Sequence, residues 1–157
     1  MLRDATSGLF SDSGSLQVPN TPAHSFSGPF SISLHVKLPG LLAVAVPLVE
    51  KAGEYIVRLT VAQELQAEIY TGGSNFLQVT TTGTVGLEAG HSVTVTWNGG
   101  TASDGLTLYV DGVADGALVA SDVGTYTAMP VTASPTNLGN EGIVYADDCY
   151  FNDISIW

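Results

Sequence analysis

The chain has 157 residues, of which 45% are hydrophobic and 12% are charged, so it is long enough to bury a core and too apolar to be disordered. Lys and Arg number 4 against 15 Asp and Glu, and the net charge of −11 leaves no basic patch for nucleic acid or anionic lipid. The longest unbroken apolar run, residues 41–46, is far shorter than the ~20 residues of a membrane-spanning helix. We therefore expect neither nucleic acid nor a membrane as a partner.

The cysteine content and the first residues bear on where the protein is made. Cys149 is the only cysteine, so no disulfide forms within the chain. Residues 1–8 lack the apolar stretch of a signal peptide. We expect either a protein made in the cytoplasm without secretion or one module of a longer secreted chain, and both alternatives stay open.

Apolar and polar residues alternate along most of the chain, which is the pattern of half-buried β-strands. The expected apolar faces are, in chain order, Ile32, Leu34 and Val36; Tyr55, Val57, Leu59 and Val61; Leu65, Ala67 and Ile69; Val93, Val95 and Trp97; Leu106, Leu108 and Val110; and Ile154 and Ile156. A helix over residues 61–69 is the alternative to two strand pieces there. Turns such as Asp111-Gly112 accept the positive φ of tight hairpins. The sequence predicts an all-β fold, an antiparallel two-sheet β-sandwich, as one domain over residues 1–157.

The segment 39–47 breaks this alternation, because prolines bracket a continuous apolar run. One interpretation is a strand buried on both faces, or one that crosses between the sheets. The other is an apolar loop that docks on a partner through Leu41, Leu42 and Val44.

Several stretches, taken in order, carry a family resemblance. They are residues 9–14 and 16–19, 30–37, 48–51, 91–99 with 106–113, 138–140, and 151–157. This ordered set resembles the laminin G-like, concanavalin A-like lectin/glucanase jelly rolls of phage virion and bacterial surface proteins. The chain departs from that pattern at His35, where the family usually has Trp, and at Asn152, where it commonly has the first of two Asp residues.

The resemblance also implies a structural calcium ion that joins the opening and closing strands. Carried over residue by residue, the ligands are Asp12 and Asp153, with Asn152 as a further contributor. Oxygen ligands of this kind suit a hard cation. The alternative is that these residues are solvated turn acids.

Candidate chemistry beyond calcium centres on aromatic residues and carboxylates. Tyr70, Asn75 and Phe76 flank a glycine turn, and they are the candidate glycan-binding residues because aromatic rings pack on the C–H faces of sugars. Trp97 and His35 are interpreted as packing residues, and His91 as a hydrogen-bonding residue at the rim of a strand.

Hydrolysis by a pair of carboxylates is not expected. A retaining glycosidase needs two carboxylates ~5 Å apart. Glu64 and Glu68 would lie ~13 Å apart along one strand, and the chain lacks a nucleophile motif. We therefore expect no enzyme activity.

The favoured hypothesis is a non-catalytic structural or adhesion module of a larger assembly. It would be a phage virion protein, as capsid decoration or as a tail or fibre module, located in a virion or a cell-surface assembly. Its partners would be the other protein subunits of the capsid or tail. The alternative is a calcium-dependent carbohydrate-binding module of a surface or secreted protein, with glycans as partners.

Overall fold

The computed structural model describes residues 8–9, 16–38, 40–72, 74–139 and 150–157. Its elements are β1 (Gly8–Leu9), β2 (Leu16–Val18), η1 (Pro22–His24), β3 (Phe30–Lys37), β4 (Val46–Lys51), β5 (Tyr55–Leu59), β6 (Glu64–Tyr70), β7 (Phe76–Thr84), β8 (Gly90–Trp97), η2 (Ser103–Gly105), β9 (Leu106–Val110), β10 (Val113–Ala114), β11 (Val119–Ala120), β12 (Thr136–Leu138) and β13 (Tyr150–Ile156). None of the described helices has the length and apolar character needed to cross a membrane.

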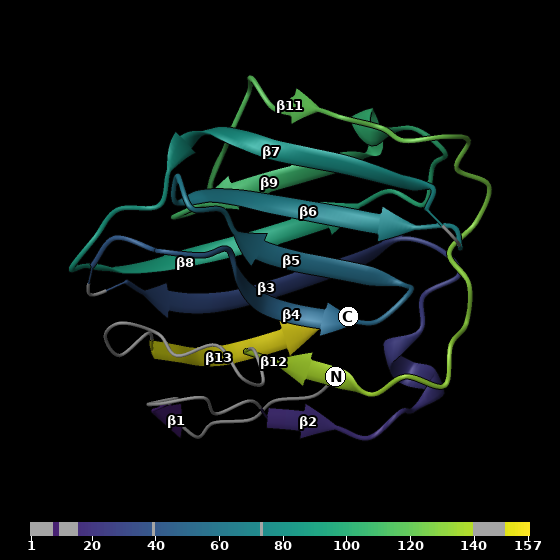
Figure 1. Cartoon of the computed structure of the whole chain (residues 1–157), viewed down its shortest axis with the longest axis horizontal. Helices are drawn as coiled ribbons and strands as arrows, with labels where there is room; N and C mark the ends of the chain where they lie inside the picture. The colour runs from purple at the N-terminus through teal and green to yellow at the C-terminus, as the bar shows by residue number, and fades with distance from the viewer. Residues whose placement is uncertain (1–7, 10–15, 39, 73, 140–149) are drawn as a thin grey trace.

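Within the described residues the strands form two antiparallel sheets. One sheet has six strands in the order β1-β13-β3-β8-β9-β10, and the other has seven in the order β11-β7-β6-β5-β4-β12-β2. Figure 1 shows the seven-stranded sheet in front of the six-stranded one. The predicted antiparallel two-sheet β-sandwich is therefore confirmed.

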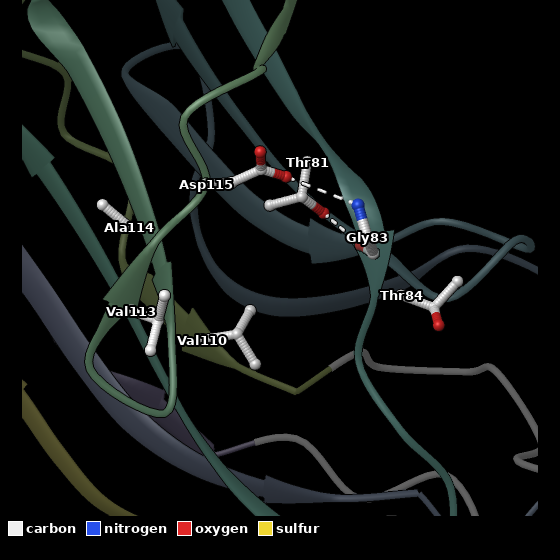
Figure 2. A pocket seen from close by; sticks show the side chains of 7 residues that line it. All are labelled: Thr81, Gly83, Thr84, Val110, Val113, Ala114 and Asp115. Atoms are coloured by element: carbon white, nitrogen blue, oxygen red, sulfur yellow. Dashed lines mark hydrogen bonds between the residues drawn. The ribbon is translucent and has the colours of Figure 1, made fainter.

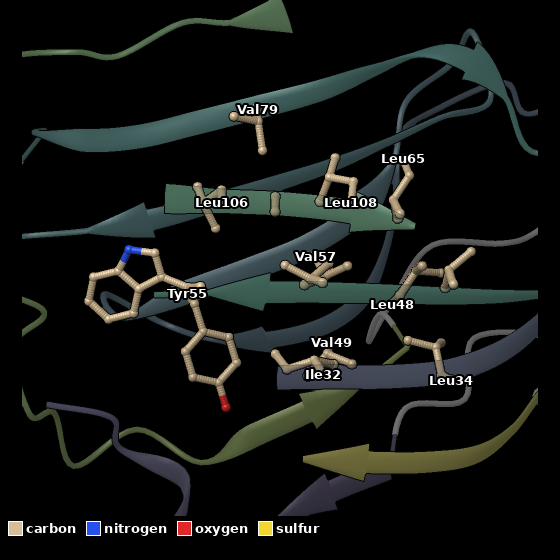
Figure 3. Packing of buried hydrophobic residues seen from close by; sticks show 14 of the residues in the cluster. Ile32, Leu34, Leu48, Val49, Tyr55, Val57, Leu65, Val79, Leu106 and Leu108 are labelled. Carbon is tan, nitrogen blue, oxygen red and sulfur yellow. The ribbon is translucent and has the colours of Figure 1, made fainter. Parts of the chain in front are cut away.

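The core lies between the two sheets, where the inward-facing residues of both meet (Figure 3). The side chains drawn and labelled there include Ile32, Leu34, Val57, Leu65, Val79, Leu106 and Leu108. Burying each Val, Leu or Ile side chain contributes about 1.5–3 kcal/mol, so the alternation fixes which face of each strand turns inward. Trp97 is buried in this core, as predicted.

The predicted alternation fails at Val61, which is exposed. The strand β5 ends at Leu59, and a turn follows in which the Gln63 N–H donates to the Thr60 carbonyl at 2.9 Å. Gln63 has a positive φ of 64°, which neither a strand nor a helix accommodates. The alternative of a helix over residues 61–69 is therefore wrong.

The apolar segment before β4 is a loop, and the interpretation of a doubly buried strand is wrong. Residues 40–45 make no strand, and the side chain of Leu41 is 75% exposed. The strand begins at Val46, and a register shift between Pro47 and Val49 turns both Leu48 and Val49 into the core. An irregularity of this kind breaks the alternation that a sequence pattern relies on.

His35 is not a packing residue, which corrects the sequence interpretation. It lies on the outer face of β3 opposite Ser92, and its side chain is exposed. Its Nδ1 lies 3.8 Å from Oδ2 of Asp153. Side chains alternate between the two faces of a strand, and Leu34 and Val36 on either side of His35 point into the core, so His35 points outward.

A buried ion pair closes one end of the sandwich. Nζ of Lys51 lies 2.9 Å from Oε1 of Glu54, and neither side chain is exposed to solvent. The Lys51 ammonium also donates to Oδ1 of Asn20 at 3.0 Å and to Oγ of Ser25 at 2.6 Å. The backbone N–H and the hydroxyl of Thr132 donate to the same oxygen of Glu54 at 2.7 and 2.9 Å. The pair therefore ties the β4–β5 turn to two distant segments.

We expect the substitution Glu54→Gln to lower the free energy of unfolding by about 3–5 kcal/mol, because it leaves the Lys51 ammonium buried without a counter-charge. Urea denaturation measures this loss. The control is Glu88→Gln, which removes the same charge at an exposed loop position and should change stability by no more than about 0.5 kcal/mol. Equal stability of the two variants would contradict the structural role of the pair.

Candidate functional site

The outer face of the seven-stranded sheet carries a concentration of polar side chains, here called the polar face. It is made by Glu50 of β4, Ile56 and Arg58 of β5, Gln66, Glu68 and Tyr70 of β6, and Phe76, Gln78 and Thr80 of β7. These residues alternate with the core residues of the same strands, so they point away from the core. In Figure 1 no described segment crosses in front of β5, β6 and β7.

Strand register arranges the polar face in three rows. The first row runs from Glu50 through Ile56 and Glu68 to Gln78, the second from Arg58 through Gln66 to Thr80, and the third joins Tyr70 to Phe76. Cross-strand neighbours lie within about 5.5 Å of each other, close enough for their side chains to interact. The sheet thus brings residues from four strands into one array.

A hydrogen-bonded network holds the middle of this array. Nη2 of Arg58 forms an ion pair with Oε1 of Glu68, and Nε of Arg58 donates to Oε1 of Gln66 at 2.6 Å. Gln66 in turn donates from Nε2 to Oγ1 of Thr80 at 2.8 Å. The Glu68 side chain is only 5% exposed, whereas that of Arg58 is 30% exposed. The guanidinium of Arg58, the amide of Gln66 and the carboxylate of Glu68 are therefore fixed in position before a ligand binds.

Tyr70 joins this network through its hydroxyl, which donates to Oε2 of Glu68. Burial, together with this hydrogen bond and the nearby Glu68 charge, raises the pKa of the Tyr70 hydroxyl well above its ordinary value. The hydroxyl therefore keeps its proton at neutral pH, and the Glu68 carboxylate is held by donors on both of its oxygens.

The structure brings two of the three predicted glycan-binding residues together. The rings of Tyr70 and Phe76 meet edge to face, with centroids 5.7 Å apart and an interplanar angle of 62°. Both are half-buried on the polar face. Asn75 instead turns toward a neighbouring loop, where its Nδ2 donates to the carbonyl of Thr125 at 3.5 Å. The assignment of all three residues to glycan binding stays a prediction.

The predicted calcium ligands fall mostly outside what the structure describes. Asp12 lies outside the described residues, and only the backbone of Asn152 is described. Asp153 has a positive φ of 52°, and its carboxylate is 68% exposed beside His35. In the described part of the chain, no three His, Cys, Asp or Glu residues gather as a metal site requires. The calcium site stays a prediction.

The predicted docking residues lie on the loop between β3 and β4. Leu41 and Val44 are exposed, while Leu42 packs partly against the core. Because Val46 pairs with Leu59, this loop and the exposed Val61 lie at the same end of the sandwich. Docking through these residues also stays a prediction.

An open pocket of about 180 Å³ lies between the end of β7 and the β9–β10 hairpin (Figure 2). It is lined by Thr81, Gly83, Thr84, Val110, Val113, Ala114 and Asp115. The carboxylate of Asp115 accepts the backbone N–H groups of Ala117, Thr82 and Gly83, which lower its pKa. This acid is therefore occupied within the fold, and the rest of the lining is small and mostly apolar.

His91 makes the hydrogen bond predicted for a residue at the rim of a strand. Its Nδ1 lies 2.7 Å from Oδ2 of Asp111, and this bond, with the backbone N–H of Ser92, lowers the pKa of Asp111. Asp111 and Gly112 both have positive φ, as the predicted hairpin turn requires.

Most of the polar face was missed by sequence reasoning. Arg58, Gln66 and Thr80 were not singled out, and Glu68 was considered only as a hydrolase carboxylate. The signal lay in the polar positions that alternate with Val57 and Ala67 in the predicted strands. Which of those positions meet across strands depends on the register, which the alternation does not reveal.

Comparison with known proteins supports the fold. A family model described as the concanavalin A-like lectin/glucanases superfamily matches residues 10–152. A sequence search of the curated proteins finds no match.

Three solved structures are similar across nearly the whole chain. CBM40 of the Ruminococcus gnavus IT-sialidase, bound to α2,3 sialyllactose, has a TM-score of 0.68 and 11% identity, covering 99% of this chain and 91% of that chain. Botulinum neurotoxin type C, which depends on interaction with two ganglioside molecules to enter cells, has a TM-score of 0.67 and 15% identity. The match covers 99% of this chain and 42% of that chain. Domains LG4-5 of the mouse laminin α1 chain have a TM-score of 0.64 and 14% identity, and the match covers 98% of this chain and 44% of that chain. The chain thus spans less than half of the toxin and laminin chains, and such identities show the fold alone.

We expect Gly124→Ala to lower the free energy of unfolding by about 1–2 kcal/mol, because Gly124 has a φ of +68°, which strains a residue with a Cβ, and because the Asn75 side chain would have to move away from that Cβ. The loop that holds Gly124 also fixes Phe76, whose backbone exchanges hydrogen bonds of 3.0 and 2.9 Å with Val123. Thermal and urea unfolding measure the loss. The matched control is Gly116→Ala, which has no neighbour within 4 Å and should be nearly neutral; an equally small effect at Gly124 would contradict this packing.

Proposed function

Because the chain belongs to the concanavalin A-like lectin/glucanase superfamily, we propose that it is a non-catalytic carbohydrate-binding module whose site is the polar face. The observation that carries this proposal is the network of Arg58, Gln66, Glu68 and Tyr70 beside the aromatic pair. The guanidinium of Arg58 and the hydroxyl of Tyr70 are the partly exposed polar groups of this network and are suited to bind the hydroxyl groups of a sugar, while the buried Gln66 and Glu68 hold them in place.

The arrangement of the polar face supports recognition of a sugar ring. The half-buried rings of Tyr70 and Phe76 offer apolar surface for the C–H groups of the sugar. Glu50 and Gln78, at the two ends of the first row, offer oxygen and nitrogen atoms for its hydroxyl groups. Because the network already fixes the central side chains, binding orders few of them and costs little conformational entropy.

The similar structures support a glycan as the ligand. The sialidase module is bound to sialyllactose, and the neurotoxin interacts with gangliosides. Both are carbohydrate-containing ligands of proteins that share the fold of this chain.

We expect Tyr70→Ala and Phe76→Ala each to weaken glycan binding at least tenfold, about 1.4 kcal/mol, through loss of the apolar contact surface. A glycan array identifies the ligand, and isothermal titration calorimetry then measures its affinity for each variant. Thr107→Ala, on the outer face of the other sheet, is the control and should bind as the parent protein does. Unchanged affinity in both aromatic variants would overturn the assignment of the site, and an array without any bound glycan would overturn the function.

A structural calcium ion is a separate proposal, carried by the family resemblance at Asp12, Asn152 and Asp153. An ion bound only by the native state stabilises that state by mass action. We therefore expect a chelator to lower the melting temperature and added calcium to restore it, as measured by calorimetry. The control is Asp153→Asn, which should melt at one temperature with or without calcium; an unchanged melt of the parent protein in chelator would contradict the proposal.

A role as a structural module of an assembly is the second candidate, favoured by the exposed apolar residues Leu41 and Val44 and by Val61 at the same end. In this proposal the loop docks on other protein subunits of a phage capsid or tail, and the protein is located in a virion or a cell-surface assembly. It is compatible with glycan binding, because the loop and the polar face occupy different surfaces of the described residues.

A further inference from the structure

The polar face carries one cationic side chain in the part of the chain that the structure describes, that of Arg58. Lys51 is fully buried in its ion pair with Glu54. Lys37 belongs to β3, in the other sheet. Among the described residues, the attraction of this face for an anionic ligand therefore depends on Arg58.

The charge of Arg58 is already compensated. Its Nη2 pairs with the carboxylate of Glu68, and its Nε donates to Gln66. A guanidinium has five N–H donors, and this network uses one at Nε and one at Nη2, so the others can donate to a sugar hydroxyl. The Arg58 side chain is 30% exposed. Releasing the guanidinium for a ligand carboxylate would leave Glu68 nearly buried without its counter-charge, which is costly.

A second carboxylate, that of Glu50, makes the net charge of the polar face negative. Glu50 lies in the same row as Glu68, with Ile56 between them. The polar face therefore holds two carboxylates and one guanidinium, in a chain whose net charge is −11. An approaching anion is therefore repelled locally and at long range.

We propose that the polar face selects uncharged glycans and rejects glycans that end in a carboxylated sugar, because the Arg58–Glu68 ion pair leaves no available positive charge. This inference rests on the proposed carbohydrate-binding function. It separates the chain from the sialidase module of similar fold, which is bound to sialyllactose.

The first experiment is a glycan array in which each glycan is printed as a pair, with and without a terminal sialic acid. We expect binding to the uncapped members and a loss of about tenfold or more in affinity on capping, as repulsion at a binding face produces. Capped members that bind as tightly as their uncapped partners, or more tightly, would overturn the inference and leave the proposed function standing. An array without binding to any member would overturn both.

The second experiment changes the charge of the face and measures the ratio of affinities for capped and uncapped lactose. Glu68→Gln keeps the size of the side chain and frees the Arg58 charge, so we expect this ratio to shift toward capped lactose by about tenfold. Glu88→Gln removes an equal charge from an exposed loop and should leave the ratio unchanged.

Glu50→Gln keeps the Arg58–Glu68 pair and provides a second variant in case Glu68→Gln unfolds. It should shift the ratio in the same direction but by a smaller factor. A folded Glu68→Gln variant with the ratio of the parent protein would overturn the inference, as would an equal shift in Glu88→Gln.

Discussion

The buried pair of Lys51 and Glu54 is the constraint on which the site-bearing end of the sandwich depends. A buried charge is costly without a partner and hydrogen bonds, and here Asn20 and Ser25 accept from the Lys51 ammonium while Thr132 donates to Oε1 of Glu54. The backbone carbonyl of Glu54 also accepts the N–H of Tyr70 at 2.8 Å. The pair therefore does more than close one end of the fold. It fixes the β4–β5 turn against the last residue of β6, where the aromatic pair of the polar face begins.

The same strands build the core and the site, so the two cannot vary independently. In β5 and β6, Val57 and Ala67 face inward while Arg58 and Glu68 face outward. A slip of one residue in the register would place charges in the core and apolar residues on the face. The ion pair on the outside and the apolar contacts on the inside thus favour one and the same register. This explains how a small sheet face can hold a precise polar array without disulfides or a covering helix among the described residues.

The sequence was sufficient for the fold but not for the site, and the difference is physical. Alternation is a local property, so the strands around Leu34, Val57 and Leu108 were predicted correctly. The network on the polar face depends on contacts between strands, which no local pattern encodes. Tyr70 and Phe76 were found only because a short hairpin keeps them close in sequence as well as in space. At His35, the family position suggested packing, whereas the alternation of side chains along β3 places this residue on the outer face, between the inward-facing Leu34 and Val36.

The two outer faces of the sandwich differ in a way that bears on function. On the six-stranded sheet, His35 and Lys37 occupy one end of the outward face of β3, and the other outward side chains of β3 and β8 are Ser and Thr, of which Ser33 and Thr94 are hydrogen-bonded to each other at 2.9 Å. Short side chains bonded to one another give a ligand few atoms to reach. On the seven-stranded sheet several outward side chains are long and planar, and Arg58 and Tyr70 are partly exposed beside the buried Gln66 and Glu68. Long, fixed and internally neutralised groups recognise a ligand by the positions of its donors and acceptors rather than by its charge, which is the property that discrimination among neutral sugars requires.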